Sequence, residues 1–291
     1  MKYRLLLIAA TVIWGTSFVI MKDLTGYLYP AWLLAFRFAA AALVMAAIFI
    51  RKRALYFDKS HVVRGLAIGV ALFAAYYTQT WGLTDTTPGK NAFLTATYCV
   101  IVPFMAWAVM KKRPTAFNLV ATFLCLFGIG LISLSSDFSI SFGDAMTLVC
   151  AFFYAVQIVM MSMLGEDHDA TVLTMWQFVA VAVCSVVPAL LFEPAPDWGA
   201  IPASCLPSMA YLAVACTAVA LLFMNVGIKH VPPATAGLLL SFESVFGALF
   251  SVLLGAEALT PRLFAGFVAV FASVVVSEYL PEKFKPQKAS E

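Results

Sequence analysis

Two stretches of equal length decide the fold: residues 66–88 read LAIGVALFAAYYTQTWGLTDTTP, and residues 211–233 read YLAVACTAVALLFMNVGIKHVPP. They register on each other without a gap at an offset of 145 residues, and the register extends over 66–130 and 211–275. The matched positions include Gly82 with Gly227, Pro88 with Pro233 and Thr115 with Thr260. The shared helix lengths and the shared punctuation by glycine and proline predict an internal repeat.

The register continues toward the N-terminus at an offset of 140 residues. There it pairs Trp14 with Tyr154, Arg37 with Gln177 and Phe38 with Phe178. Each copy then holds five apolar segments, and because five is odd, the second copy must enter a membrane in the opposite orientation. Inverted repeats of this kind are typical of secondary transporters.

The composition supports a membrane protein. Of the 291 residues, 63% are hydrophobic and 11% charged, whereas soluble domains have about 45–50% apolar and about 25% charged residues. The net charge is +3 without a basic stripe, so we expect the lipid bilayer and not nucleic acid as a partner. The six cysteines show no metal-ligand spacing, and we predict no disulfide, metal or cofactor. The first apolar run lacks a cleavage site and is expected to be retained.

Ten segments are long enough, at about 20 residues each, to cross the bilayer as helices. They are 5–22, 31–50, 65–83, 90–110, 116–134, 143–163, 171–192, 208–228, 234–254 and 262–280. The fold class is therefore an all-α integral membrane protein with ten transmembrane helices in two inverted five-helix repeats. We expect the repeats at 1–137 and 138–282, followed by a cytoplasmic tail at 283–291.

The distribution of Lys and Arg predicts the orientation. With the N-terminus in the cytoplasm, 14 of the 18 basic residues fall in inside segments, 3 fall outside, and Arg37 lies within a span. This contrast satisfies the positive-inside rule. We expect a multi-pass protein of the plasma (cytoplasmic) membrane with both termini in the cytoplasm.

Several motifs resemble those of a known family. They are Trp14-Gly15-Thr16-Ser17-Phe18, Arg37-Phe38, Pro88, and Gly255-Ala256-Glu257-Ala258-Leu259-Thr260. Together they resemble the drug/metabolite transporter superfamily, EamA-like branch, over essentially the whole chain. The resemblance implies a ten-helix transporter, often an exporter of amino acids or similar metabolites, with a central cavity lined by both repeats.

Two charged side chains fall deep within predicted spans, Arg37 and Glu243. A charge at such depth costs about 2.5–3.5 kcal/mol on insertion scales, and it usually has a partner or a function. We predict that Arg37 holds an anionic group of the substrate and that Glu243 accepts an ammonium or a proton. A structural ion pair or an interhelical polar contact is the alternative.

Polar and aromatic residues at equivalent positions of the two repeats complete the candidate site. The full set of predicted substrate-binding residues is Trp14, Arg37, Gln79, Asn91, Thr95, Tyr98, Tyr154, Gln157, Gln177, Asn225 and Glu243. Thr80 matches Asn225 across the repeats, and Glu243 is in addition the predicted proton-coupling residue. For the aromatic residues the alternative is interhelical packing, and for the amides it is hydrogen bonding between helices.

The chain contains no P-loop, no H-E-x-x-H motif and no G-x-S-x-G motif, so we do not expect an enzyme. The leading hypothesis is a secondary active transporter that exports a small metabolite such as an amino acid by alternating access, with protons as a possible coupling ion. The alternatives are a transporter of nucleotide sugars or other phosphorylated metabolites, and a non-transporting receptor or assembly subunit. No oligomeric state is predicted.

Overall fold

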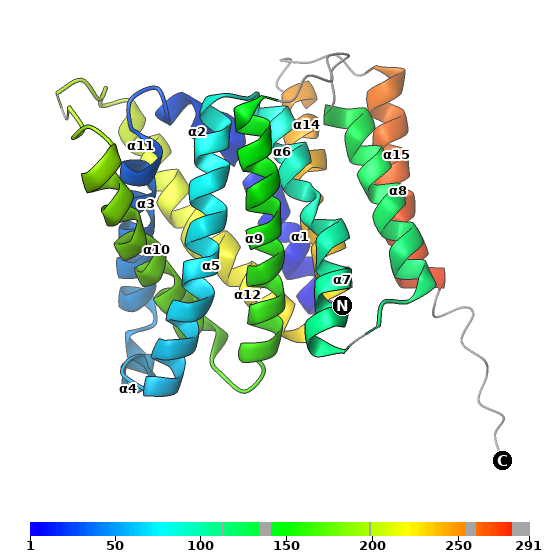
Figure 1. Cartoon of the computed structure of the whole chain (residues 1–291), viewed down its shortest axis with the longest axis horizontal. Coiled ribbons are helices and arrows are strands. Elements are labelled where there is room, and N and C mark those ends of the chain that lie inside the picture. The colour runs from blue at the N-terminus through cyan, green and yellow to red at the C-terminus, as the bar shows by residue number, and fades with distance from the viewer. Residues whose placement is uncertain (112, 134–140, 198, 254–259, 281–291) are drawn as a thin grey trace.

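The computed structural model describes residues 1–111, 113–133, 141–197, 199–253 and 260–280. Within these ranges the chain is helical throughout (Figure 1), and eight helical spans are long and apolar enough to cross a membrane. The long spans are Lys2–Leu24, Pro30–Ile48, Lys59–Thr84, Pro88–Met110, Phe142–Leu164, Ala170–Phe192, Cys205–His230 and Pro233–Phe250. Two shorter apolar helices, Ala116–Leu131 and Pro261–Ser277, stand at the positions of the fifth and tenth predicted spans. The predicted fold class is confirmed.

Several spans consist of more than one helical element. In chain order the elements are α1 (Lys2–Gly15), α2 (Ser17–Leu24), α3 (Pro30–Ile48), η1 (Ile50–Lys52), α4 (Arg53–Tyr56), α5 (Lys59–Thr84), α6 (Pro88–Ala96), α7 (Tyr98–Met110), α8 (Ala116–Ser133), α9 (Phe142–Leu164), α10 (Ala170–Phe192), α11 (Cys205–Tyr211), η2 (Leu212–Val219), α12 (Ala220–His230), α13 (Pro233–Leu240), α14 (Glu243–Leu253), α15 (Pro261–Val274) and η3 (Val275–Tyr279).

The helix starts follow ordinary capping chemistry in both repeats. Pro88 and Pro233, which the register pairs, each open a helix at its first position, where the missing N–H group has no intrahelical partner in any case. Thr115 and Thr260 form a second matched pair. Their hydroxyl oxygens accept the backbone N–H groups three residues on, at 3.1 Å and 3.2 Å respectively, which satisfies orphan donors of the first turn.

The main helix pairs each join one helix from the N-terminal half to one from the C-terminal half. α5 packs along α9 and α10, α3 packs along α10, and α1 packs along α12 and α14. α8 and α15 pack along each other at one side of the molecule (Figure 1). The two halves are therefore interleaved, and a site at the centre of the bundle receives residues from both.

Glycines allow the closest of these approaches. A Cβ atom on Gly82 of α5 would lie 2.6 Å from the carbonyl oxygen of Gly143 on α9, and one on Gly143 would lie 2.5 Å from the carbonyl oxygen of Gly82. Small residues at such crossings let helix backbones pack tightly where lipid gives no hydrophobic driving force. The α5–α9 pair is fixed at this point.

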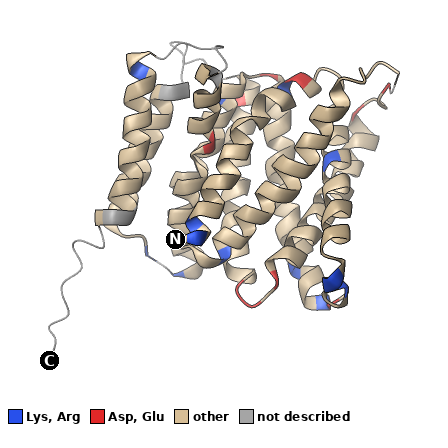
Figure 2. Cartoon of the chain, turned by 180° about the vertical axis from the view of Figure 1, so that it is seen from behind, with Lys and Arg blue, Asp and Glu red and all other residues tan. Residues whose placement is uncertain are grey.

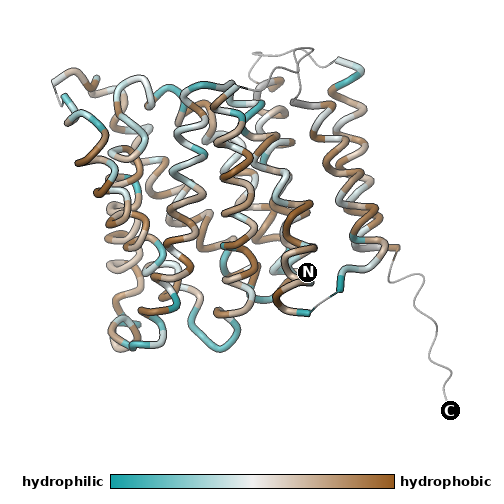
Figure 3. The backbone as a smooth tube through the Cα atoms, viewed as in Figure 1, coloured by the Kyte–Doolittle hydropathy of each residue, from teal (hydrophilic) through white to brown (hydrophobic). Residues whose placement is uncertain are grey.

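The surface has the polarity of a membrane-embedded bundle. Hydrophobic residues run along the helices, and hydrophilic residues gather at the two ends (Figure 3). Figure 2 shows Lys and Arg concentrated at the end that holds α4 and the start of α1, which we call the basic end. The positive-inside rule would place the basic end in the cytoplasm, and this orientation stays a prediction.

Candidate functional site

Three spans are interrupted midway, and the interruptions meet at one pocket. The breaks lie at Thr16 between α1 and α2, at Thr97 between α6 and α7, and at Ser241 and Phe242 between α13 and α14. At each break a hydroxyl donates to the carbonyl oxygen three residues earlier: Thr16 to Ile13 at 2.8 Å, Thr97 to Leu94 at 2.6 Å and Ser241 to Leu238 at 2.7 Å. Side-chain hydroxyls thus supply a hydrogen-bond donor to a backbone carbonyl group at each break.

The predicted spans 5–22, 90–110 and 234–254 are found as Lys2–Leu24, Pro88–Met110 and Pro233–Phe250, and each of them contains one of these interruptions. Apolar residues run through all three stretches, so hydropathy alone does not reveal a break. At each break a hydroxyl side chain offers the backbone a local alternative to the helical hydrogen bond.

A π-helical segment, η2, forms another part of the wall. The Thr217 hydroxyl donates to the carbonyl oxygen of Leu212, five residues earlier, at 2.7 Å. The carbonyl oxygen of Cys216 accepts the indole N–H of Trp14 at 2.8 Å, and the Thr217 hydroxyl oxygen accepts Nε–H of Arg37 at 2.5 Å. π-helical turns within α-helices frequently occur at functional sites, and this one holds two side chains of the pocket.

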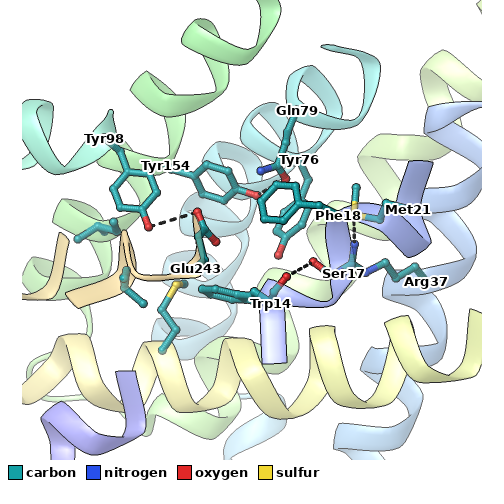
Figure 4. A pocket seen from close by; sticks show the side chains of 13 residues that line it. Trp14, Ser17, Phe18, Met21, Arg37, Tyr76, Gln79, Tyr98, Tyr154 and Glu243 are labelled. Atoms are coloured by element: carbon teal, nitrogen blue, oxygen red, sulfur yellow. Dashed lines mark hydrogen bonds between the residues drawn. The ribbon is translucent and has the colours of Figure 1, made fainter. Parts of the chain in front are cut away.

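The pocket is small. Its free volume is about 30 Å³, which is room for about one water molecule. Figure 4 shows Glu243 beside Tyr98 and Arg37 beside Met21, in different parts of the pocket. The lining residues are Trp14, Ser17, Phe18, Met21, Arg37, Tyr76, Gln79, Tyr98, Tyr154, Ile158, Met224, Leu240 and Glu243. Six predicted site residues line it, namely Trp14, Arg37, Gln79, Tyr98, Tyr154 and Glu243.

Glu243 is the first residue of α14 and has 6% of its surface exposed. Its Oε1 accepts the hydroxyl of Tyr98, the first residue of α7, at 3.5 Å. This distance is long for a hydrogen bond to oxygen. Tyr98 and Glu243 are matched by the repeat register, so equivalent helix starts of the two halves meet in the pocket.

Arg37 is 4% exposed. Its guanidinium lies 5.6 Å from the ring centroid of Phe38 and 5.1 Å from that of Tyr76, and Nη1 contacts the sulfur of Met21 at 3.2 Å. Within the described residues, no carboxylate lies within 4.0 Å of this guanidinium, Glu243 included. The two deep charges of opposite sign face one pocket without pairing with each other.

Asn91 and Thr95 lie one hydrogen bond behind the pocket wall. The side-chain amide of Gln79 donates to Thr95 at 3.1 Å and its oxygen accepts the Tyr154 hydroxyl at 2.9 Å. Asn91 donates to the backbone oxygen of Gln79 at 3.2 Å and to Thr147 at 2.8 Å. This network fixes the side chains of Gln79 and Tyr154, which do line the pocket.

Gln157, Gln177 and Asn225 form a second buried network that does not reach the pocket surface. Gln157 donates to Gln177 at 3.2 Å and to Asn225 at 3.1 Å, and Asn225 donates to Thr174 at 2.9 Å. Hydrogen bonding between helices, the alternative noted for these amides, accounts for all of these contacts. The Thr80 hydroxyl is buried without a hydrogen-bond partner in the described part of the chain.

The sequence interpretation missed seven lining residues: Ser17, Phe18, Met21, Tyr76, Ile158, Met224 and Leu240. Helical periodicity would have found three of them, because Ser17, Phe18 and Met21 follow Trp14 by three, four and seven residues, the spacing that indicates a shared helix face in the sequence. Tyr76 stands three residues before Gln79 in the same way. Part of the fourth motif, Gly255–Leu259, lies outside the described residues, as does the tail at 283–291.

Polar contacts join the two halves at both ends of the bundle. At the basic end, Lys52 pairs with Asp169 at 2.7 Å. Burial raises the pKa of the Asp169 carboxyl, but the hydrogen bonds from Lys52 and from the first-turn N–H groups of α10 outweigh it and hold this pKa below its usual value. At the opposite end Lys90 pairs with Asp144 at 2.6 Å. Asp144 is 1% exposed.

Comparison with known proteins gives consistent matches over nearly the whole chain. An uncharacterized transporter of Archaeoglobus fulgidus is 31% identical over 268 residues, which cover 91% of this chain and 82% of that protein. The uncharacterized transporter YyaM of Bacillus subtilis is 24% identical over 86% of this chain and 85% of its own length. A solved crystal structure superimposes with a TM-score of 0.83 over 98% of this chain and 99% of that chain at 17% identity, which shows a common fold.

The profile of the EamA-like transporter family matches the chain twice, at residues 1–134 and 141–279. The two matches together span nearly the whole sequence, and each contains residues of the pocket described above. A family of transporters, and not of enzymes, is thereby indicated. The chain belongs to the EamA-like transporter family.

Proposed function

We propose that this transporter is a secondary active exporter of a neutral amino acid with an apolar side chain. The proposal rests on the pocket at the junction of the proposed repeats, 1–137 and 138–282. The guanidinium of Arg37 and the carboxylate of Glu243 both line this pocket, and they do not pair with each other. A buried charge without a partner is costly, and a zwitterionic ligand supplies the partner for both. Alternating access of the two repeats would then carry this ligand across the membrane.

Each charge has a defined role in this proposal. The guanidinium of Arg37 binds the α-carboxylate through its N–H donors. The Glu243 carboxylate accepts the α-ammonium, and the aromatic faces of Trp14 and Tyr154 stabilise that cation further. The substrate side chain packs against the apolar part of the lining, which includes Ile158, Met224 and Leu240.

The same lining favours an amino acid over a phosphorylated metabolite. Arg37 is the one Lys or Arg among the thirteen lining residues. A phosphate carries up to two negative charges and a pyrophosphate more, so a single guanidinium would leave most of that charge uncompensated in an apolar surrounding. A monovalent carboxylate matches one guanidinium in charge.

Glu243 also supports proton coupling in this proposal. Burial in an apolar surrounding favours the neutral form of a carboxyl group, whereas access to water or to an ammonium favours the charged form. If access to the pocket alternates between the two faces, Glu243 takes up a proton on one face and releases it on the other. Exchange of proton for substrate at one carboxylate would drive export.

Counterflow in proteoliposomes tests the proposed substrate class. Vesicles loaded with unlabelled leucine should accumulate radiolabelled leucine, because exchange requires binding and alternating access but no pH gradient. Leucinamide lacks the carboxylate, and 4-methyl-2-oxopentanoate lacks the ammonium, so each should compete at least about ten-fold less well than leucine. One charged contact of about 1.5–3 kcal/mol corresponds to that factor or more.

Two results would contradict the proposal. The first is the absence of counterflow with every proteinogenic neutral amino acid in vesicles that contain folded protein. The second is equal competition by leucine and both analogues, which would mean that neither charge of the substrate is recognised.

A further inference from the structure

We propose that Thr217 is a positioning residue that turns the outer edge of the Arg37 guanidinium toward the substrate, and that it thereby selects a carboxylate. This inference rests on the proposed function, because it assigns to Arg37 the anionic end of the ligand. Thr217 is fully buried in η2 and does not line the pocket. It acts on the substrate through Arg37 alone.

The hydrogen bonds of Thr217 fix the direction of its hydroxyl group. A threonine hydroxyl has one hydrogen and two lone pairs. The hydrogen is directed to the carbonyl oxygen of Leu212 at 2.7 Å, so the oxygen can only accept on its other side. There it accepts Nε–H of Arg37 at 2.5 Å.

This bond occupies one side of the guanidinium and leaves another side available. The side that carries Nε is taken by Thr217, whereas the two terminal nitrogens lie beyond it. Of these, Nη1 contacts the Met21 sulfur at 3.2 Å, which is a weak acceptor. The planar edge formed by Nη1 and Nη2 therefore remains for an anion. A planar group with two oxygens fits that edge end-on through two parallel hydrogen bonds.

The π-helical geometry of η2 makes this placement possible. The five-residue spacing between Leu212 and Thr217 belongs to a π-helix and not to an α-helix. The neighbouring carbonyl group, that of Cys216, receives the indole N–H of Trp14 at 2.8 Å. One short segment of the C-terminal half thus orients two pocket residues of the N-terminal half.

Leucine counterflow with three threonine variants tests the proposal. Thr217→Val removes the acceptor at nearly constant volume, Thr217→Ser keeps it, and Thr11→Val is the control. The Thr11 hydroxyl is also fully buried, but it donates to the backbone oxygen of Ile8 and does not line the pocket. We expect Thr217→Val to raise the KM for leucine about ten-fold with little change in the maximal rate, because a hydrogen bond to a charged group is lost.

The carboxylate-free analogue separates positioning from a general structural effect. The concentration of leucinamide needed for half-maximal competition should stay the same in Thr217→Val, and Thr217→Ser should restore the KM for leucine. An equal loss for leucine and leucinamide, an unchanged KM in Thr217→Val, or the same loss in Thr11→Val would overturn the proposal.

A second measurement does not depend on transport. In protein labelled with ¹⁵N-arginine, the loss of one NMR signal in Arg37→Lys identifies the Nε–H group of Arg37. This signal should indicate a strong hydrogen bond in the wild type and in Thr217→Ser but not in Thr217→Val. An unchanged signal in Thr217→Val would overturn the positioning role. If wild-type protein carries no amino acid, the proposed function fails, and this signal still decides whether Thr217 orients the guanidinium.

Discussion

Among single residues, Glu243 leads to the most specific prediction. It is nearly fully buried, and its carboxylate accepts the hydroxyl of Tyr98 at 3.5 Å. Substitution by glutamine keeps the size and the acceptor oxygen but removes the ability to bind a proton. We therefore expect Glu243→Gln to fold with an unchanged melting temperature and to lose leucine accumulation driven by a pH gradient, by about ten-fold or more, since that uptake requires proton exchange.

Gradient-driven uptake in vesicles with a pH step measures this effect. Glu166→Gln is the matched control, because Glu166 is exposed in the loop between α9 and α10 and loses the same charge. Full gradient-driven uptake by Glu243→Gln would exclude the coupling role. Loss of folded protein in that variant would instead indicate that the carboxylate has a structural role.

A residue of the candidate site could be predicted from the sequence where its type is uncommon within a membrane span. Arg37 and Glu243 stood out because charges are costly in a span, and Tyr98 and Tyr154 because the repeat register matched them to Glu243 and Trp14. Met224 and the other apolar lining residues could not be predicted in this way, because the sequence does not distinguish a methionine that faces the pocket from one that packs in the core. Gln177 was placed by register at a matching position, but register does not tell the pocket face of a helix from the face behind it.

At the scale of helices, the crossing of α1 and α14 holds the pocket together. A Cβ atom on Gly15 would lie 2.8 Å from Cβ of Phe246 and 2.9 Å from the backbone nitrogen of Gly247. Alanine at this position must push α14 away from α1, and overpacking of this kind costs about 1–3 kcal/mol. Trp14 and Glu243 stand on these two helices, so their spacing across the pocket changes as well.

We expect Gly15→Ala to lower both the melting temperature and the rate of leucine counterflow. Gly89→Ala is the control, because no heavy atom outside its immediate surroundings lies within 4 Å of the added Cβ, and alanine is favoured over glycine within a helix by about 0.5–1 kcal/mol. Equal melting temperatures and rates for Gly15→Ala and the wild type would show that the crossing tolerates a methyl group.

The helical spans could be predicted from the sequence, but the breaks within them could not. The ten apolar segments follow from hydropathy because lipid requires long apolar helices. The breaks at Thr16, Thr97 and Ser241 interrupt stretches in which most side chains remain apolar, and a hydroxyl in a membrane helix also occurs where no break exists. Thr11 donates to the carbonyl oxygen of Ile8 in the same three-residue pattern within unbroken α1. The hydroxyl pattern in the sequence is therefore not sufficient to locate a break.

At the scale of the whole molecule, the basic end defines the expected orientation. The count of Lys and Arg predicts that this end faces the cytoplasm. Cysteine at Asp197, in the segment between α10 and α11, should react with an impermeant thiol reagent added to intact cells, whereas cysteine at Lys59, at the start of α5, should react only after the membrane is opened.

The labelling experiment needs a suitable background. Cys205 begins α11 and is partly exposed, so both variants are made with Cys205→Ser, and that parent should remain unlabelled from outside. The reverse pattern, with Lys59→Cys labelled in intact cells and Asp197→Cys protected, would place the basic end outside.

The small free volume of the pocket, about 30 Å³, has a consequence for the search for inhibitors. A ligand of amino-acid size binds only those molecules whose pocket has widened, so its measured affinity equals the affinity for the widened form multiplied by the fraction of molecules in that form. If one molecule in about a hundred is widened, measured binding is about a hundred-fold weaker than the contacts alone would give. Compounds chosen to fit the narrow pocket would bind the form of the transporter that does not bind substrate. Larger amphipathic zwitterions that fit only the widened pocket should hold the transporter in that single state.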